Sequence, residues 1–155
     1  KMQRGEITDW GVLKRSLWLS MSMTLKELII KHEGLKLKTY HCTSGKLTIG
    51  YGRNLDDRGI SGAEAEYMLL NDIAHFTYEV KQHVPSFSEL SEVRQWVLID
   101  MCFNLGTNGL LTFKTMLQAV EDKEFEIAAD AILDSKYAKQ VGNRAIENAT
   151  MMLQG

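Results

Sequence analysis

HEGLKLKTYHCTSGKLTIGYG, residues 32–52, is the stretch in which the hydrophobic period changes from that of a helix to that of a strand. Its first residues close a run with helical spacing, and Gly34 follows Glu33 where a left-handed C-terminal cap belongs. From Leu35 onward apolar and polar residues alternate on both sides of the turn-forming pair Ser44 and Gly45. The stretch therefore predicts a helix that ends at Glu33 and a small antiparallel ribbon after it.

The beginning of this helix is marked by a capping box. Thr24 and Glu27 have the spacing at which each side chain can accept a hydrogen bond from the other residue's backbone N–H. We therefore expect the folded domain to begin near Met23 and to span residues 23–155.

Residues 1–22 differ from the rest of the chain. Trp10, Leu13, Leu17 and Trp18 recur at helical spacing, which predicts a short amphipathic helix. This N-terminal extension would pack on the domain or remain poorly ordered, and the alternative is a role at a membrane surface. Lys1 stands before the first Met and is expected to be a processing remnant.

Two long helices are predicted after the ribbon. Ser61 and Glu64 form a second capping box, from which a helix of some twenty residues would run until Pro85 ends it. The segment VRQWVLIDMCFNLG, which ends at Gly106, is apolar almost all round, so we expect a helix buried on every side.

Further helices are expected around residues 110–120, 125–133 and 144–153, the last of them capped by Asn143. The predicted fold class is therefore α+β, with a mostly helical lobe around a buried central helix and a small antiparallel β ribbon.

Composition excludes several classes of function. The net charge of −2 provides no broad cationic field, so we expect no nucleic-acid partner. The two cysteines, Cys42 and Cys102, form no disulfide framework and lack zinc-ligand spacing, which predicts free thiols in a reducing cytoplasm. No apolar run approaches the ~20 residues that a transmembrane helix needs, so we expect no stable membrane insertion. We also expect a monomer, although the sequence itself does not determine the oligomeric state.

Glu33 is a candidate acid catalyst. A carboxylate on the last turn of a helix lies at the negative end of the helix dipole, and nearby apolar residues would also favour its protonated form. The alternative is an ordinary surface glutamate. His32 and Glu33 do not open a zinc-protease helix, because Lys36 stands where the second histidine is needed. We therefore expect no metal.

The spacing of Glu33, Cys42 and Thr48, followed by IGYG, resembles the catalytic signature of the phage lysozymes of glycoside hydrolase family 24. The second position of that signature is Asp or Cys in the family, and this chain has the Cys form. The similarity extends from about Leu25 to Met152. It includes the blocks EGLKLK, TIG, VR, FNLG and NRA.

The resemblance implies a lysozyme-like fold in which the ribbon forms one side of a cleft. It also implies cleavage of the β-1,4 bond between N-acetylmuramic acid and N-acetylglucosamine in peptidoglycan, without a cofactor. Glu33 would protonate the leaving oxygen, and Thr48 would help to position a water on the opposite sugar face. The expected substrate-binding residues are Asn104, Gln140 and Arg144, of which Arg144 would lie close to Glu33.

The thiol of Cys42 raises a chemical question, because a free thiol with a pKa of about 8.5 is mostly protonated at neutral pH. Only a few per cent would be thiolate unless nearby cations such as Lys46 or His41 lowered that pKa. Cys42 would then orient or partly deprotonate the attacking water rather than act as a nucleophile. Arg53 departs from the family pattern, since many members have His there, and the loop over residues 54–60 is short.

The resemblance favours a phage or prophage endolysin, made in the bacterial cytoplasm and passed to the wall through a holin-type membrane lesion. Two alternatives remain open. One is a non-catalytic wall-binding protein, and the other is a muramidase-type toxin or effector.

Overall fold

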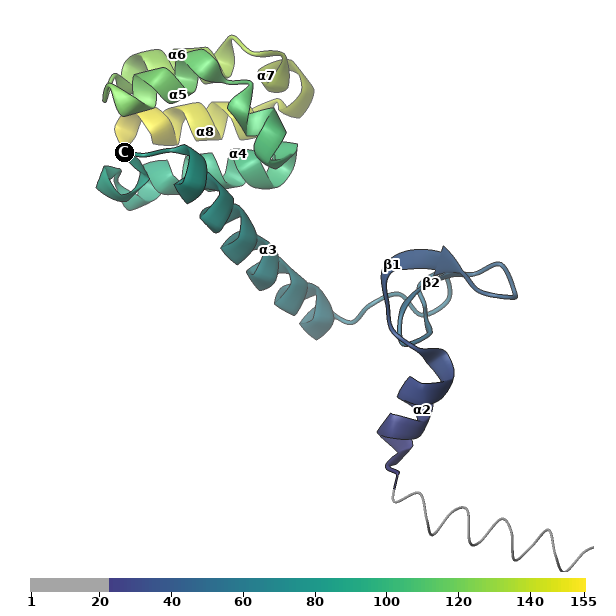
Figure 1. Ribbon diagram of the computed structural model, residues 1–155. Coiled ribbons are helices and arrows are strands. Elements are labelled where there is room, and N and C mark those ends of the chain that lie inside the picture. The colour runs from purple at the N-terminus through teal and green to yellow at the C-terminus, as the bar shows by residue number, and fades with distance from the viewer. Residues whose placement is uncertain (1–22) are drawn as a thin grey trace, which may run out of the picture. The chain divides into compact units, whose positions relative to one another are not determined.

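The computed structural model describes residues 23–155, and it divides into two compact units (Figure 1). The first unit ends at Ser61, so its described part is residues 23–61, and the second unit runs from Gly62 to Gly155. The expected boundary between residues 22 and 23, and the helix expected within residues 1–22, lie outside the described residues and remain predictions.

The first unit begins with helix α2 (Leu25–Glu33). Its capping box is confirmed: the Thr24 backbone N–H donates to Glu27 Oε2 at 2.7 Å, and the Glu27 N–H donates to Thr24 Oγ1 at 3.2 Å. Gly34 follows the helix with the predicted positive φ of 68°, but its ψ of 168° lies outside the left-handed helical region. The chain therefore leaves the helix directly into an extended strand.

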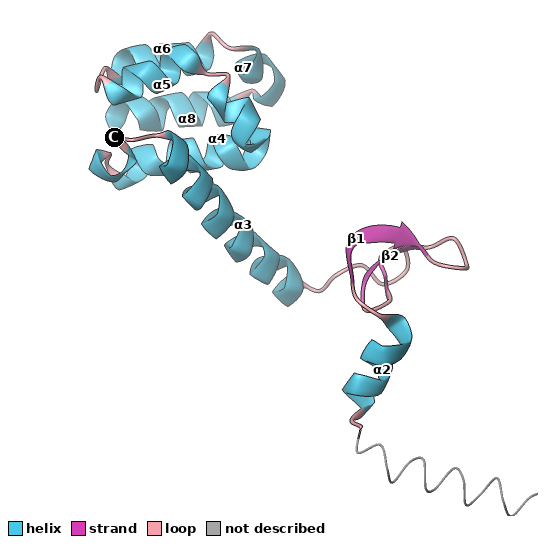
Figure 2. Cartoon of the chain, viewed as in Figure 1, coloured by secondary structure: helices cyan, strands magenta, loops and turns pink. Residues whose placement is uncertain are grey.

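A three-stranded antiparallel sheet follows, with strands in the order β1 (Lys36–His41), β2 (Leu47–Gly50) and β3 (Arg53–Asn54) (Figure 2). The predicted ribbon is confirmed as β1 and β2. The sequence did not predict β3, because a strand of two residues is too short to have a period.

The second unit is helical. In Figure 1, α8 lies between α4 on one side and the pair α5 and α6 on the other, while α3 runs out from this bundle. The elements are α3 (Gly62–His83), the short 3₁₀-helix η1 (Phe87–Glu89), α4 (Glu92–Leu111), α5 (Lys114–Glu121), α6 (Phe125–Leu133), α7 (Lys136–Val141) and α8 (Asn143–Gln154). The fold class is α+β, as predicted.

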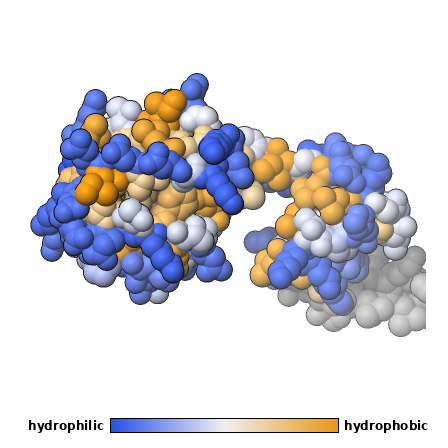
Figure 3. Space-filling model, turned by 90° about the horizontal axis from the view of Figure 1, so that it is seen from above, coloured by the Kyte–Doolittle hydropathy of each residue, from blue (hydrophilic) through white to orange (hydrophobic). Residues whose placement is uncertain are grey.

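Helix α4 supplies the centre of the core but is not buried all round. Val97, Leu98 and Met101 are fully buried, whereas Trp96 is 51% exposed in the structure and Phe103 is 38% exposed. The expectation of burial on every side is therefore wrong for one face of the helix. Figure 3 shows that apolar side chains, in orange, remain at the surface of the helical unit.

Gly106 has a φ of 74°, which breaks the helical geometry where the sequence predicted the end of α4. One more turn then runs to Leu111, and the helix expected over residues 110–120 begins only at Lys114. A glycine outside helical φ/ψ thus kinks this element without ending it, because helical residues continue on both sides.

The predicted N-cap of α8 is wrong. Asn143 is the first residue of the helix, and the cap is Gly142, which has no side chain to accept a hydrogen bond. Helix α7 was not predicted, although Ser135 is a recognisable N-cap whose Oγ accepts from the Ala138 N–H at 3.2 Å. Within residues 23–155 no helix is both long and apolar enough to cross a bilayer.

Candidate active site

Glu33, at the end of α2, is exposed within its unit, and its carboxyl group lies against the backbone of Gly52. A Cβ atom added to Gly52 would be 2.5 Å from Glu33 Oε2 and 2.8 Å from Cδ. Gly52 also has a φ of 76°, a backbone conformation that residues with a Cβ atom rarely adopt. A side chain at residue 52 would therefore force the Glu33 carboxylate to shift from its present position.

The role of Gly52 was not predicted from the sequence. The available signal was its place in IGYG, directly after the catalytic signature. A glycine can serve there either as a turn residue or as a point of close approach, and the sequence does not distinguish the two.

Cys42 lies in the tight turn that joins β1 to β2. Its backbone N–H donates to the Lys46 carbonyl at 3.0 Å, and the Gly45 N–H donates to the Cys42 carbonyl at 2.8 Å. The thiol is half-buried, with Sγ 3.0 Å from Ser44 Oγ. The turn thus places a hydroxyl group directly beside the thiol.

This turn lowers the pKa of the Cys42 thiol from 9.0 to about 7. The largest cause is the hydrogen bond with the Ser44 side chain, followed by hydrogen bonds from the backbone of Lys46 and Ser44, and together these outweigh the desolvation of the thiol. A substantial share of Cys42 is therefore thiolate near neutral pH.

The low thiol pKa does not depend mainly on the nearby cations that the sequence offers, Lys46 and His41. Hydrogen bonds are the largest causes of the lower thiol pKa, and the charge interaction between Lys46 and Cys42 is the smallest of the causes that act on Lys46. The Lys46 ammonium instead pairs with Asp57 Oδ1 at 3.0 Å, and this partner raises the pKa of Lys46. Hydrogen-bond donors close to sulfur are therefore the main stabilisation of the thiolate.

Thr48 occupies the second residue of β2 and is 3% exposed. Its hydroxyl donates to the Lys46 carbonyl at 2.9 Å. The single hydroxyl proton is used in that bond, so the oxygen has only acceptor capacity left. Such an oxygen can accept a hydrogen bond from a water molecule. Glu33, Cys42 and Thr48 all belong to the first unit.

Arg144, on α8, pairs with Asp100. Its Nε donates to Asp100 Oδ2 at 2.9 Å and its Nη2 donates to Asp100 Oδ1 at 2.7 Å. The expected proximity of Arg144 to Glu33 remains a prediction. Asp100 was not singled out from the sequence, although a lone carboxylate within the apolar run VLIDMCF was a usable signal.

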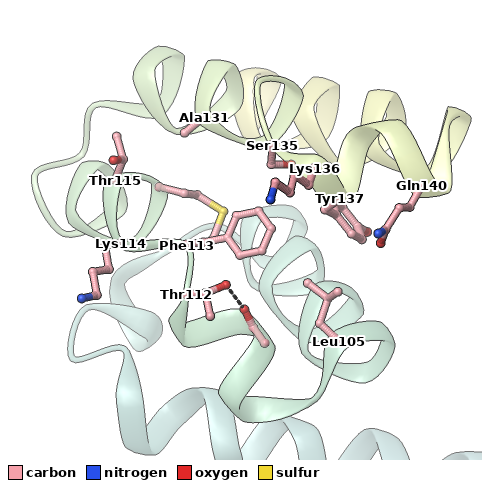
Figure 4. A pocket seen from close by; sticks show the side chains of 12 residues that line it. Leu105, Thr112, Phe113, Lys114, Thr115, Ala131, Ser135, Lys136, Tyr137 and Gln140 are labelled. Atoms are coloured by element: carbon pink, nitrogen blue, oxygen red, sulfur yellow. Dashed lines mark hydrogen bonds between the residues drawn. The ribbon is translucent and has the colours of Figure 1, made fainter.

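Gln140 lines a pocket of about 440 Å³ in the helical unit (Figure 4). Phe113 and Tyr137 provide aromatic surface there, and Lys114 and Lys136 add two cations. Asn104 does not line this pocket, but the next residue, Leu105, does. The pocket combines apolar surface with a few polar groups, as binding sites for organic ligands do.

Among the described residues, no group of three or more His, Cys, Asp or Glu side chains is arranged to hold a metal ion. Glu33, Cys42 and Thr48 offer a carboxyl group, an acidic thiol and an acceptor hydroxyl.

Known proteins are similar to this chain over most of its length. Residues 30–149 match the family described as Phage lysozyme. The chain is 28% identical over 155 residues to "Probable T4-type lysozyme 1" of Dictyostelium discoideum, across 81% of this chain and 91% of that protein. It is 30% identical over 121 residues to "Endolysin" of Acyrthosiphon pisum secondary endosymbiont phage 1, across 76% of this chain and 80% of that one.

A third relative is larger. The chain is 27% identical over 162 residues to "Pre-baseplate central spike protein Gp5" of Enterobacteria phage T4, across 86% of this chain but only 28% of that protein. The small β-sheet and the helical unit, together with these matches, define a glycoside hydrolase of the lysozyme type. The chain belongs to the phage lysozyme family.

Proposed function

We propose that this lysozyme is a muramidase that hydrolyses the β-1,4 bond between N-acetylmuramic acid and N-acetylglucosamine in peptidoglycan, with Glu33 as general acid and Cys42 and Thr48 as the groups that activate water. The observation that carries the proposal is the Cys42 thiol, whose pKa is lowered to about 7 by the adjacent Ser44 hydroxyl and by backbone donors. A thiol of that pKa is partly ionised near neutral pH, and its thiolate form can accept a proton.

The reaction would proceed by a single displacement. Glu33 donates its proton to the glycosidic oxygen while a water molecule attacks the anomeric carbon from the opposite face. The Cys42 thiolate accepts one proton from that water, and Thr48 Oγ1, whose own proton is used by the Lys46 carbonyl, accepts a hydrogen bond from the other O–H group. The new reducing end then has inverted configuration.

The proposed substrate-binding residues come from the helical unit. Peptidoglycan offers N-acetyl oxygens, hydroxyl groups and carboxylates, which are suitable acceptors for the Arg144 guanidinium. Gln140 would bind part of the polymer in the pocket that also contains Lys114 and Lys136. Asn104, which precedes the pocket residue Leu105 in the sequence, would also bind the substrate.

We further propose that the biological role is host cell lysis, by an endolysin that leaves the bacterial cytoplasm through a holin lesion. Support comes from the relative named "Endolysin", which aligns with 76% of this chain. A muramidase-type toxin or effector would have the same chemistry, and an immunity gene beside the coding gene, in place of a holin gene, would identify it. A non-catalytic wall-binding protein would bind peptidoglycan without cleaving it.

The test is a turbidity assay on cells stripped of their outer membrane, followed by analysis of the soluble products. We expect clearing and new N-acetylmuramic acid reducing ends. Glu33→Gln should fold normally and lose nearly all of this activity, because the amide keeps the shape but has no proton to donate. Wild-type clearing by that variant would refute the role of Glu33, and sugar binding without products would identify a wall-binding protein.

A further inference from the structure

A polar network joins α4, α7 and α8 in the helical unit, and the proposed proton transfers do not use it. At its centre is Asp100, whose carboxylate accepts hydrogen bonds from Arg144 Nε, Arg144 Nη2 and Asn148 Nδ2, at 2.9, 2.7 and 2.9 Å. Asn148 Nδ2 also donates to the Tyr137 hydroxyl at 3.3 Å. The Asp100 carboxylate is thus held from two sides.

The pairing leaves one edge of Arg144 unused. A guanidinium group has five N–H donors, and the bonds to Asp100 use the Nε and Nη2 edge. In the part of the chain that the structure describes, no hydrogen bond involves Arg144 Nη1. Its two N–H groups are therefore available to an acceptor on a ligand.

Arg144 also lies at a cavity. Together with Asp100 it lines a pocket of about 510 Å³ whose other walls are mostly apolar and include Leu69, Ile73, Trp96 and Phe103. Asp100 pairs with the Nε and Nη2 edge of the Arg144 guanidinium. The Nη1 edge remains as a hydrogen-bond donor with a fixed orientation. A bidentate pair of this kind restricts the guanidinium plane far more than a single hydrogen bond does.

The ion pair in this network contributes little to the stability of the fold. The side chains of Arg144 and Asp100 are 37% and 41% exposed, and ion pairs with that exposure stabilise a fold only weakly. Burial would raise the pKa of Asp100, but the hydrogen bonds from Arg144 and Asn148 outweigh it and lower that pKa, so the carboxylate stays ionised. Asn148 itself is 4% exposed, which gives Asp100 a fixed support.

We propose that Asp100 is a positioning residue of this lysozyme, which orients Arg144 so that the Nη1 edge of the guanidinium binds an acceptor group of the peptidoglycan. This inference rests on the proposed role of Arg144 in substrate binding. Asp100 acts through Arg144 and does not touch the substrate.

The test measures binding without turnover. Calorimetry measures the Kd for purified soluble peptidoglycan fragments in the Glu33→Gln background. Three proteins are compared: the one that retains Asp100, and the ones that also carry Asp100→Asn or Asp100→Ala. We expect both substitutions to weaken binding by about tenfold, the size of effect expected when one charge-assisted hydrogen bond to the ligand is lost or weakened. In a background that also contains Arg144→Ala, adding Asp100→Ala should change the Kd no further.

Glu79→Gln is the matched control, because Glu79 is another carboxylate of the helical unit that accepts a side-chain hydrogen bond, from Thr107 Oγ1 at 3.1 Å. It should leave the Kd unchanged. Equal Kd values for Asp100 and its variants would overturn the inference, and so would an equal loss with and without Arg144. If Asp100→Ala does not fold, Asp100→Asn still decides, since it keeps the shape. Failure of hydrolysis by the wild type would refute the proposed function separately, because these Kd values do not depend on cleavage.

Discussion

Gly52 and Glu33 lie so close together that there is no room between them for a methyl group. A Cβ on Gly52 would lie 2.5 Å from Glu33 Oε2. The present position of the Glu33 carboxylate therefore requires a residue without a side chain at position 52. A substitution at Gly52 can therefore test the position of the carboxyl group without any change to Glu33 itself.

Gly52→Ala should lower the rate of peptidoglycan hydrolysis by about 100-fold, because displacing a catalytic group by about an ångström has an effect of that size. The positive φ of 76° should also lower the free energy of unfolding by about 1 kcal/mol. Initial lysis rates and thermal melts measure the two effects.

Gly50→Ala is the control for that experiment. Gly50 has a similar φ of 70°, but nothing lies within 4 Å of the position that its Cβ would take. It should show a comparable loss of stability and a much smaller loss of activity. Equal rates for the two variants would mean that backbone strain, and not contact with Glu33, is responsible.

Substitutions at Cys42 should separate a water-activating role from a nucleophilic one. Cys42→Asp should remain active, because a carboxylate can also accept a proton from water. Cys42→Ser should be substantially slower, because a hydroxyl group is a much weaker base. NMR of the first product reports the anomeric configuration, and mass spectrometry searches for an adduct. A retained configuration with a glycosyl-Cys42 adduct would contradict the proposed role.

Ser44→Ala should raise the pKa of the Cys42 thiol, because the Ser44 side chain is the largest cause of its lowering to about 7. Since the thiolate is the active form, the wild-type rate should rise with pH through about 7, and the variant should need a higher pH.

The pH dependence of alkylation by iodoacetamide measures that shift directly. Cys42 should react and the enzyme should lose activity, whereas Cys102, which is fully buried, should remain unmodified in the native state. Unchanged alkylation profiles in wild type and Ser44→Ala would exclude Ser44 as the cause.

Deletion of residues 1–22 should leave hydrolysis of purified peptidoglycan largely intact. The capping box at Thr24 starts α2 through two hydrogen bonds of its own, at 2.7 and 3.2 Å, and neither needs a residue before Thr24. The specific rate of the truncated chain and its thermal melt are the measurements. An unfolded or inactive product would show that the extension belongs to the folded core.

Much of the local structure was predictable because its signals lie within a few residues of one another. The capping box, the turn at Ser44 and Gly45 and helix α6 over residues 125–133 all follow from short-range hydrogen bonds and from hydrophobic period. The errors had the same origin. Asn143 is a favourable cap by type, but the backbone placed Gly142 at that position.

The amino-acid sequence by itself determined the fold class, the family signature from Glu33 to Thr48 and the ends of most helices, because each depends on residue type and spacing along the chain. The tertiary structure alone decided that Asp100 pairs with Arg144, 44 residues away, and that Gly52 lies against Glu33. The physical reason is that a hydrogen bond or a steric contact needs two groups about 3–4 Å apart in a suitable orientation, and residues far apart in sequence reach that separation only once the backbone has folded.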